Sequence, residues 1–230
     1  MQQAIQGFTP VSALSAETRS AFIWRTYNHV ALSIVGFAAI EVYLFKSGIA
    51  LAMAQRMLGT NWLLVLGAFM LVGWIATHVA HTVASRPLQY LALAGFVLAE
   101  AIIFVPLLYI AMRLQPGIIE SAAGVTLIGT IGLMSVAHIT RKDFSFLRGI
   151  LVWGGVLVLV GIVSSILFGF YLGTWFSVAM IGFAGAAVLY DTSNILLHYP
   201  EDRYVGAALQ LFASIAMMFW YVLRLFMSRD

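Results

Sequence analysis

The sequence predicts an all-α membrane protein, a bundle of seven transmembrane helices, from its composition and from the spacing of its apolar segments. Hydrophobic residues make up 62% of the 230 residues, and charged residues make up 9%. A soluble globular domain carries about 25% charged residues, so water cannot solvate the surface of a chain this apolar. The apolar residues also fall into segments of about 20, the length that crosses a bilayer as a helix.

Seven segments meet this length, and the breaks between them carry the charges and prolines. The spans are predicted, in order, at about 27–45, 62–84, 89–112, 117–139, 149–169, 174–197 and 205–227. The breaks that delimit them read KSGIALAMAQRMLGTN, ASRPLQ, RLQPG, TRKDFSFLRG, FYLGT and HYPEDRYV. Residues 47–54 in the first break are themselves apolar, which predicts a short interfacial helix before the second span.

The first 22 residues have no basic start followed by a short apolar core, so they do not form a secretory signal. They are predicted to be a flexible tail, which leaves residues 23–230 as a single transmembrane domain. Basic residues set orientation, because loops rich in Lys and Arg stay in the cytoplasm. The weak excess lies on the N-terminal side and favours a cytoplasmic N-terminus: Arg19, Arg25, Arg86, Arg141, Lys142, Arg148 and Arg203, against Lys46, Arg56, Arg113, Arg224 and Arg229.

Acidic residues within the predicted spans are the first candidates for function. An ionised side chain at the bilayer centre costs roughly 2.5–3.5 kcal/mol on insertion scales, so such residues usually have a role. Asp191 lies in the sixth span, about 10 Å from His198 at 1.5 Å per residue. Glu100 lies in the middle of the third span with no partner near it in sequence. Glu41 lies close to Lys46 and is expected to reach the membrane interface.

Histidines gather at one face of the predicted bundle if the helices alternate in direction. His78, His81 and His138 end their spans on the side toward which Asp191 lies, together with His29 and His198. Histidine titrates near neutral pH, so a cluster with Asp191 suits a pH sensor. Polar rings snorkelling to the interface are an equally simple interpretation. The seventh span adds Gln210, Ser214 and Tyr221 on one helix face, where they oppose Asp191 or join helices by hydrogen bonds.

No motif in the sequence supports an enzymatic activity. The sequence has no HExxH for a zinc protease and no GxSxG for a serine nucleophile. It has no cysteine, and its seventh span has no lysine for a retinal Schiff base. HVAH at 78–81 is a weak haem or metal signal, and nothing resembles a nucleic-acid-binding stretch. We therefore expect no catalytic residue, no cofactor and no nucleic-acid partner.

Two motifs carry a family resemblance. ITRKDFSFLRGIL at 139–151 and LYDTSNILLHYPEDRYVGAALQLFAS at 189–214 resemble the Bax inhibitor-1 family, and within it the proteobacterial YccA-type branch. The resemblance is clear over about 120–230 and weaker over 1–115. It implies a bacterial inner-membrane protein in which the seventh helix is central and the other six surround it.

The resemblance also implies two activities. One is a pH-sensitive calcium leak controlled by paired aspartates on helices six and seven. The other, for the YccA-type branch, is restraint of the membrane-anchored AAA+ protease FtsH, with the N-terminal tail as the part that the protease grips. The first aspartate position falls on Asp191 and the second on Ser214, so the carboxylate pair is incomplete. Glu100 is a candidate to replace the missing second carboxylate.

Three hypotheses follow from these residues. The first is a non-enzymatic modulator of an FtsH-type protease. The second is a leak for Ca²⁺ gated by protonation of Asp191 and nearby histidines. Its pH-sensing latch would consist of Asp191, Ser214, His78, His81 and Glu100, with Asn194, Gln210 and His138 as supporting polar groups. Ca²⁺ prefers six to eight oxygen ligands, so Asp191 with its hydroxyl and amide neighbours is a poor calcium site. The third is an assembly factor in which Asp191 only joins two helices.

Overall fold

The computed structural model describes residues 9–228, and within them it confirms the predicted class, with helices and no strand. Seven of these helices are long and apolar enough to cross a membrane. Their bounds are α1 Ala16–Lys46, α3 Trp62–Thr82, α4 Arg86–Leu114, α5 Ile118–Thr140, α6 Leu147–Phe168, α7 Gly173–Leu197 and α8 Tyr204–Met227. The short helix α2 spans Ile49–Leu58, and two 3₁₀ turns span Val11–Ala13 and Glu201–Arg203.

Local chemistry sets several of these bounds. The side chain of Ser15 accepts a hydrogen bond from the Thr18 backbone N–H and so caps the start of α1. Asn61 caps α3 in the same way, as side-chain oxygens satisfy the free N–H groups of a helix start. Gly169 ends α6 at φ +71°, a left-handed conformation that glycine adopts without steric cost.

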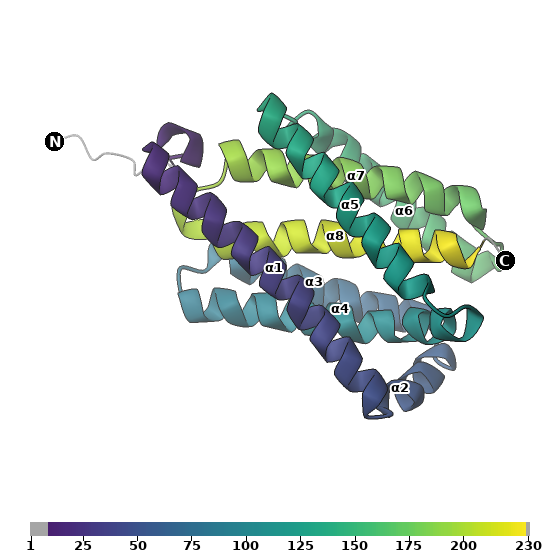
Figure 1. The fold of residues 1–230 in the computed structure, drawn as a ribbon. Coiled ribbons are helices and arrows are strands. Elements are labelled where there is room, and N and C mark those ends of the chain that lie inside the picture. Colours follow the sequence, from purple (N-terminus) through teal and green to yellow (C-terminus); the bar gives the residue numbers. More distant parts are fainter. Residues whose placement is uncertain (1–8, 229–230) are drawn as a thin grey trace.

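Helix α8, the seventh spanning helix, is central, as the family resemblance implies. It packs against α1, α3, α4, α5 and α7, and in Figure 1 it runs through the middle of the molecule between α4 on one side and α7 on the other. It is the most buried of the spanning helices, whereas α6 has no buried residue at all. The core of the protein therefore lies between α8 and the helices that surround it.

Aromatic rings fill the core where α1, α4 and α8 meet. The ring of Phe104 lies 5.1 Å from that of Phe37, 5.5 Å from Phe219 and 4.9 Å from Trp220. Phe104 is 1% exposed. Edge-to-face and stacked pairs of this kind add to the stabilisation from burial, so this cluster fixes how the first helices pack on the last.

The chain before α1 differs from the flexible tail expected over 1–22. Residues 1–8 lie outside the described residues, but residues 9–22 are packed against the protein. The Val11 backbone N–H donates to the Tyr199 carbonyl at 2.8 Å, and the Ser12 hydroxyl donates to the Leu197 carbonyl at 2.7 Å. Val11 is fully buried and Phe22 is 2% exposed. Burial of these two apolar side chains offsets the entropy lost on ordering the segment.

The apolar stretch at 47–54 forms part of α2, close to the short helix predicted there. Helix α2 buries Ala50 and Ala54 against α4 near the end of α1.

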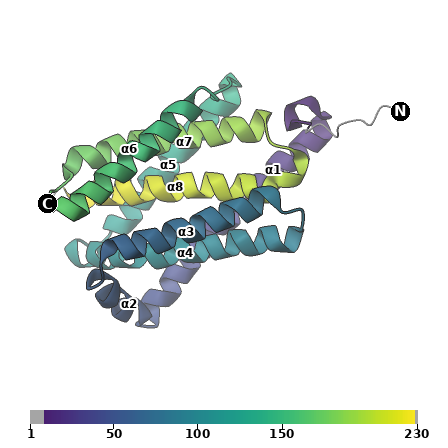
Figure 2. The ribbon, with the colours of Figure 1, turned by 180° about the vertical axis from the view of Figure 1, so that it is seen from behind.

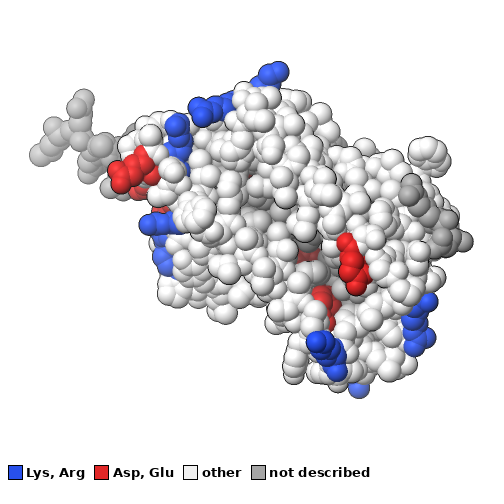
Figure 3. All heavy atoms as spheres, viewed as in Figure 1, with Lys and Arg blue, Asp and Glu red and all other residues white. Residues whose placement is uncertain are grey.

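Figure 3 shows basic side chains gathered at the two ends of the molecule, with a band between them that has few charged groups. This distribution suits a bundle whose ends lie at the two surfaces of a bilayer.

Candidate functional site

The buried acid of α7 is bound to α8. The Ser214 hydroxyl donates a hydrogen bond of 2.5 Å to Oδ2 of Asp191, and the two residues are 4% and 2% exposed. Asp191 therefore lies inside the bundle and faces the central helix, as expected from the sequence. Hydrogen bonds between transmembrane helices contribute roughly 0.6 to 1.7 kcal/mol, so this pair is a clasp between α7 and α8.

Small residues are buried on both α7 and α8, where they let each helix pack closely against its neighbours. Ala184, Gly185 and Ala187 are buried on α7, and Gly206, Ala207 and Ala208 are buried on α8. Gly206 also brings α8 against α3, because a Cβ atom there would lie 3.0 Å from the Ala80 carbonyl oxygen. Backbones that approach through small residues gain packing contacts that lipid cannot supply.

A cleft of about 790 Å³ runs beside this clasp and is walled by α3, α4, α6, α7 and α8. We call it the cleft. Figure 2 shows α6 above α8 and α3 below it. Four of the predicted site residues line the cleft together: Glu100, Asp191, Gln210 and Ser214. Glu100, 7% exposed, thus shares a cavity with Asp191.

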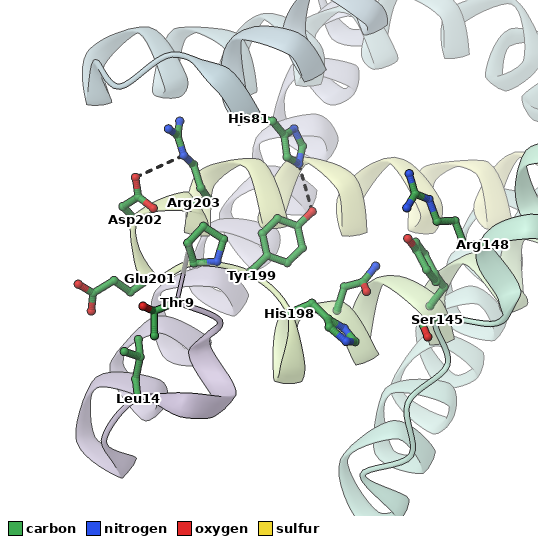
Figure 4. Close-up of a pocket in the computed structure, with 13 residues that line it drawn as sticks. Thr9, Leu14, His81, Ser145, Arg148, His198, Tyr199, Glu201, Asp202 and Arg203 are labelled. Atoms are coloured by element: carbon green, nitrogen blue, oxygen red, sulfur yellow. Dashed lines mark hydrogen bonds and ion pairs between the residues drawn. The ribbon is translucent and has the colours of Figure 1, made fainter. Parts of the chain in front are cut away.

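A second cavity, the chamber, has a volume of about 1280 Å³ at the end of the bundle where α7 stops and α8 starts. It contains the predicted residues His81 and Asn194, with His198 and Tyr199 from the connection between the two helices. Figure 4 shows Arg148 and His81 projecting into it from opposite walls, while Glu201 and Asp202 lie at its outer end.

Two side chains, Arg148 and Tyr190, line both the chamber and the cleft. The two cavities therefore adjoin at this point, about one residue along α7 from Asp191. A polar chamber at the end of the bundle is in this way placed next to the cleft that reaches the buried clasp.

The chamber contains a hydrogen bond between His81 and Tyr199. Nδ1–H of His81 donates to the Thr77 carbonyl at 2.8 Å, so the neutral ring accepts at Nε2 from the Tyr199 hydroxyl, 3.1 Å away. Burial raises the pKa of the Tyr199 hydroxyl, and the nearby carboxyl of Asp191 raises it further. Tyr199 therefore keeps its proton and links α3 to the α7–α8 connection.

The structure does not bring His78 or His138 to this site. His78 is exposed and stacks on Trp74 of its own helix, with ring centroids 5.8 Å apart. His138 on α5 accepts at Nε2 from the Tyr27 hydroxyl at 3.2 Å and donates at Nδ1 to the Met134 carbonyl. The five histidines do lie toward one end of the bundle, but only His81 and His198 line the chamber.

A further contact joins the two loops at this end. His198 Nε2 lies 3.3 Å from Asp143 Oδ2. The Ser145 backbone N–H, which donates to Asp143 at 2.8 Å, lowers the pKa of that carboxyl, and His198 contributes to the same shift. Asp143 is in this way held ionised beside His198, and the α5–α6 loop is tied to the end of α7.

Glu41 differs from the expectation that it reaches the interface beside Lys46. It is 6% exposed, and neither of its carboxyl oxygens has a hydrogen-bond partner among residues 9–228. No group of three or more His, Asp or Glu side chains in the described part of the chain is arranged to hold a metal ion.

Sequence reasoning missed three residues of the site: Arg148, Tyr190 and Tyr199. In the sequence, Arg148 served only to predict how the chain is oriented in the membrane. Tyr190 directly precedes Asp191, and this adjacency was the one signal available. Arg148 lies 43 positions from Asp191 in sequence, so their proximity depends on how α6 packs on α7.

These features define a multi-pass, all-α membrane protein with a buried carboxyl clasped to a central helix. The chain belongs to the family described as "Inhibitor of apoptosis-promoting Bax1", the Bax inhibitor-1 family, whose sequence pattern matches residues 19–230.

Known relatives cover different parts of the chain. The Escherichia coli protein "Modulator of FtsH protease YccA" is 39% identical over 94 residues, which are 40% of this chain and 42% of that protein. "Protein LIFEGUARD 4" of Arabidopsis thaliana is 28% identical over 96% of this chain and 90% of its own length. Human "Bax inhibitor 1" is 26% identical over 84% and 83%. The match to the E. coli protein thus spans less than half the length of either chain.

Proposed function

We propose that the protein is a non-enzymatic modulator of a membrane-anchored AAA+ protease of the FtsH type in a bacterial inner membrane. The observation that carries the proposal is its 39% identity to a protein named as a modulator of that protease. A second E. coli relative with the same identity is named an inner membrane protein.

The chemistry of the clasp is compatible with this role. Ser214, not a second acid, faces Asp191, so the paired carboxylates that the family resemblance links to a calcium leak are incomplete. A hydroxyl donating to a carboxyl holds two helices together without presenting a pair of anionic ligands to a cation. We interpret the clasp as keeping the α7–α8 unit in the shape that the protease contacts.

The test is a pull-down from native membranes combined with the half-life of a substrate of the protease. The tagged protein is expected to co-purify the protease, and deletion of its gene is expected to shorten the half-life. Ser214→Ala is expected to weaken both effects, because it removes the clasp. Ser135→Ala is the matched control, since Ser135 is exposed and bonds only to a carbonyl of its own helix. Absence of the protease together with unchanged half-lives would contradict the proposal.

A pH-sensitive Ca²⁺ leak is the second candidate, and one observation favours it. The cleft reaches Asp191 and adjoins the chamber at Arg148 and Tyr190, so an ion entering the chamber would meet the clasp next. Liposomes loaded with a calcium dye separate the two functions. A modulator without a leak gives no flux, whereas a leak gives a flux that Asp191→Asn changes. Ser214→Asp restores the second carboxylate and is expected to increase any flux.

A further inference from the structure

The polar chamber and the apolar cleft together have the shape of a site for an amphipathic molecule. Arg148 and Tyr190 lie where the two meet. Beyond them the cleft is lined mostly by apolar side chains, among them Leu151, Val158 and Ile166 of α6. A molecule with a charged head and an apolar tail would place the head in the chamber and the tail in the cleft.

The length of the cleft suits an extended hydrocarbon chain. Arg148 and Ile166 both line it, and at 1.5 Å per residue they are about 27 Å apart along α6. The cleft is therefore long enough to take an extended acyl chain of a lipid.

The position of Arg148 indicates the charge of the head. It is the second residue of α6, at the end of a spanning helix, where lipid headgroups lie. Figure 4 shows it directed into the chamber. Neither of the two ion pairs found in residues 9–228 includes Arg148, and the chamber acid Asp202 is already paired with Arg203. A guanidinium in this setting binds phosphate well through its fixed set of N–H donors.

The bilayer itself can supply such a molecule. Helix α6 buries no residue and makes only a small contact with α3, so the cleft is open to the side between these helices. We propose that the cleft binds one anionic phospholipid of the surrounding leaflet, with its phosphate at Arg148 and an acyl chain between α3 and α6. This site does not depend on the protease or on ion conduction.

The head of the lipid is tested by competition. The protein is reconstituted with equal amounts of phosphatidylglycerol and phosphatidylcholine of matched chains, and retained lipid is counted by native mass spectrometry. Wild type is expected to keep one phosphatidylglycerol in preference. Arg148→Ala is expected to lower that preference about fivefold, the effect of one basic residue at an anionic surface. Lys142→Ala removes the same charge from an exposed position in the α5–α6 loop that precedes this helix, and it is expected to change nothing.

The tail is tested by filling the cleft. Gly155 lines it, and a Cβ atom there meets only Phe183 at 4.0 Å, so Gly155→Leu is expected to displace the retained lipid. Gly161, on the same helix, has nothing within 4 Å of its Cβ position and does not line the cleft, so Gly161→Leu is the control. Thermal unfolding of both variants shows whether each is folded.

A photo-crosslinking residue at Leu151 identifies the occupant in native membranes. Attachment to phospholipid supports the proposal, and attachment to a protein overturns it. The proposal also fails if wild type retains both lipids in their bulk ratio. It fails equally if Arg148→Ala behaves like Lys142→Ala. None of these results bears on whether the protease co-purifies, so the two proposals fail separately.

Discussion

Helices α6 and α8 are both long apolar spans, yet they have opposite positions in the protein. By composition α6 is the most apolar of the seven, but it has no buried residue and shows Trp153, Leu157 and Phe168 on its outer face. Helix α8 is less apolar, and it has more buried residues than any other helix of the described chain. In Figure 2, α6 lies on the outside of the bundle and α8 at its centre.

The difference shows that hydropathy in a membrane protein does not distinguish contact with lipid from burial in protein. Lipid is as apolar as leucine, so nothing drives an apolar helix away from it. The central position instead goes to the helix with small residues that allow close packing and polar residues that find partners. On α8 these are Gly206, Ala207 and Ala208, with Ser214 bonded to Asp191. Substitutions should therefore be costly on α8 and its neighbours and mild on α6.

The largest difference is expected from removing an aromatic ring. Phe104→Ala empties a site among Phe37, Phe219 and Trp220 and should lower the free energy of unfolding by about 3–5 kcal/mol. Phe168 at the end of α6 is 79% exposed, so Phe168→Ala should have little effect. Unfolding of both variants in detergent by thermal or denaturant titration measures this. Equal losses of unfolding free energy in the two variants would contradict the expected difference between the core and α6.

A smaller difference is expected from adding a methyl group to a helical glycine. In Gly206→Ala the new Cβ lies 3.0 Å from the Ala80 carbonyl oxygen, and separating α8 from α3 should cost about 1–3 kcal/mol. Gly161→Ala on α6 meets no atom within 4 Å and should be neutral or slightly stabilising, because alanine favours helix. The same unfolding experiment measures the stability of both variants. A tolerated Gly206→Ala would mean that α3 is not held tightly on α8.

The clasp is expected to contribute less. Ser214→Ala leaves Oδ2 of Asp191 without its hydroxyl donor, at a cost of roughly 0.6–1.7 kcal/mol for a bond between membrane helices. Asp191→Asn keeps an acceptor oxygen for the Ser214 hydroxyl and should cost less. Ser135→Ala serves again as the exposed control. If Ser214→Ala unfolds at the same temperature as the wild type, the clasp does not contribute to holding α7 on α8.

The smallest effect concerns the loop contact at the end of α7. The Ser145 N–H and His198 lower the pKa of Asp143 below its ordinary value of 3.8. A lowered folded-state pKa stabilises the protein above about pH 4, and this contribution is lost as pH falls through the folded pKa. Because Asp143 is largely exposed, the contribution is below about 1 kcal/mol. Asp143→Asn should therefore flatten the acid side of the melting-temperature profile between pH 3 and 5 slightly. An identical acid side would rule out the contribution.

Most of the fold could be predicted from apolar runs and their breaks. The seventh predicted span, 205–227, matches α8 at Tyr204–Met227, and the second, 62–84, matches α3 at Trp62–Thr82. The first span was predicted at 27–45, but α1 starts at Ala16. Glu17, Arg19 and Arg25 made the early turns too polar for a hydropathy criterion. They are helical because Ser15 caps them and Phe22 is buried.

The sequence by itself determined the class of protein, the order of its spans and the presence of an acid in the sixth of them. These depend on local composition, because a bilayer selects segments by length and polarity alone. Only the tertiary structure decided that Glu100 shares a cleft with Asp191, that His78 and His138 lie elsewhere, and that Arg148 joins the chamber to the cleft. Such proximities arise from packing between helices distant in sequence, which depends on side-chain shape and not on hydropathy.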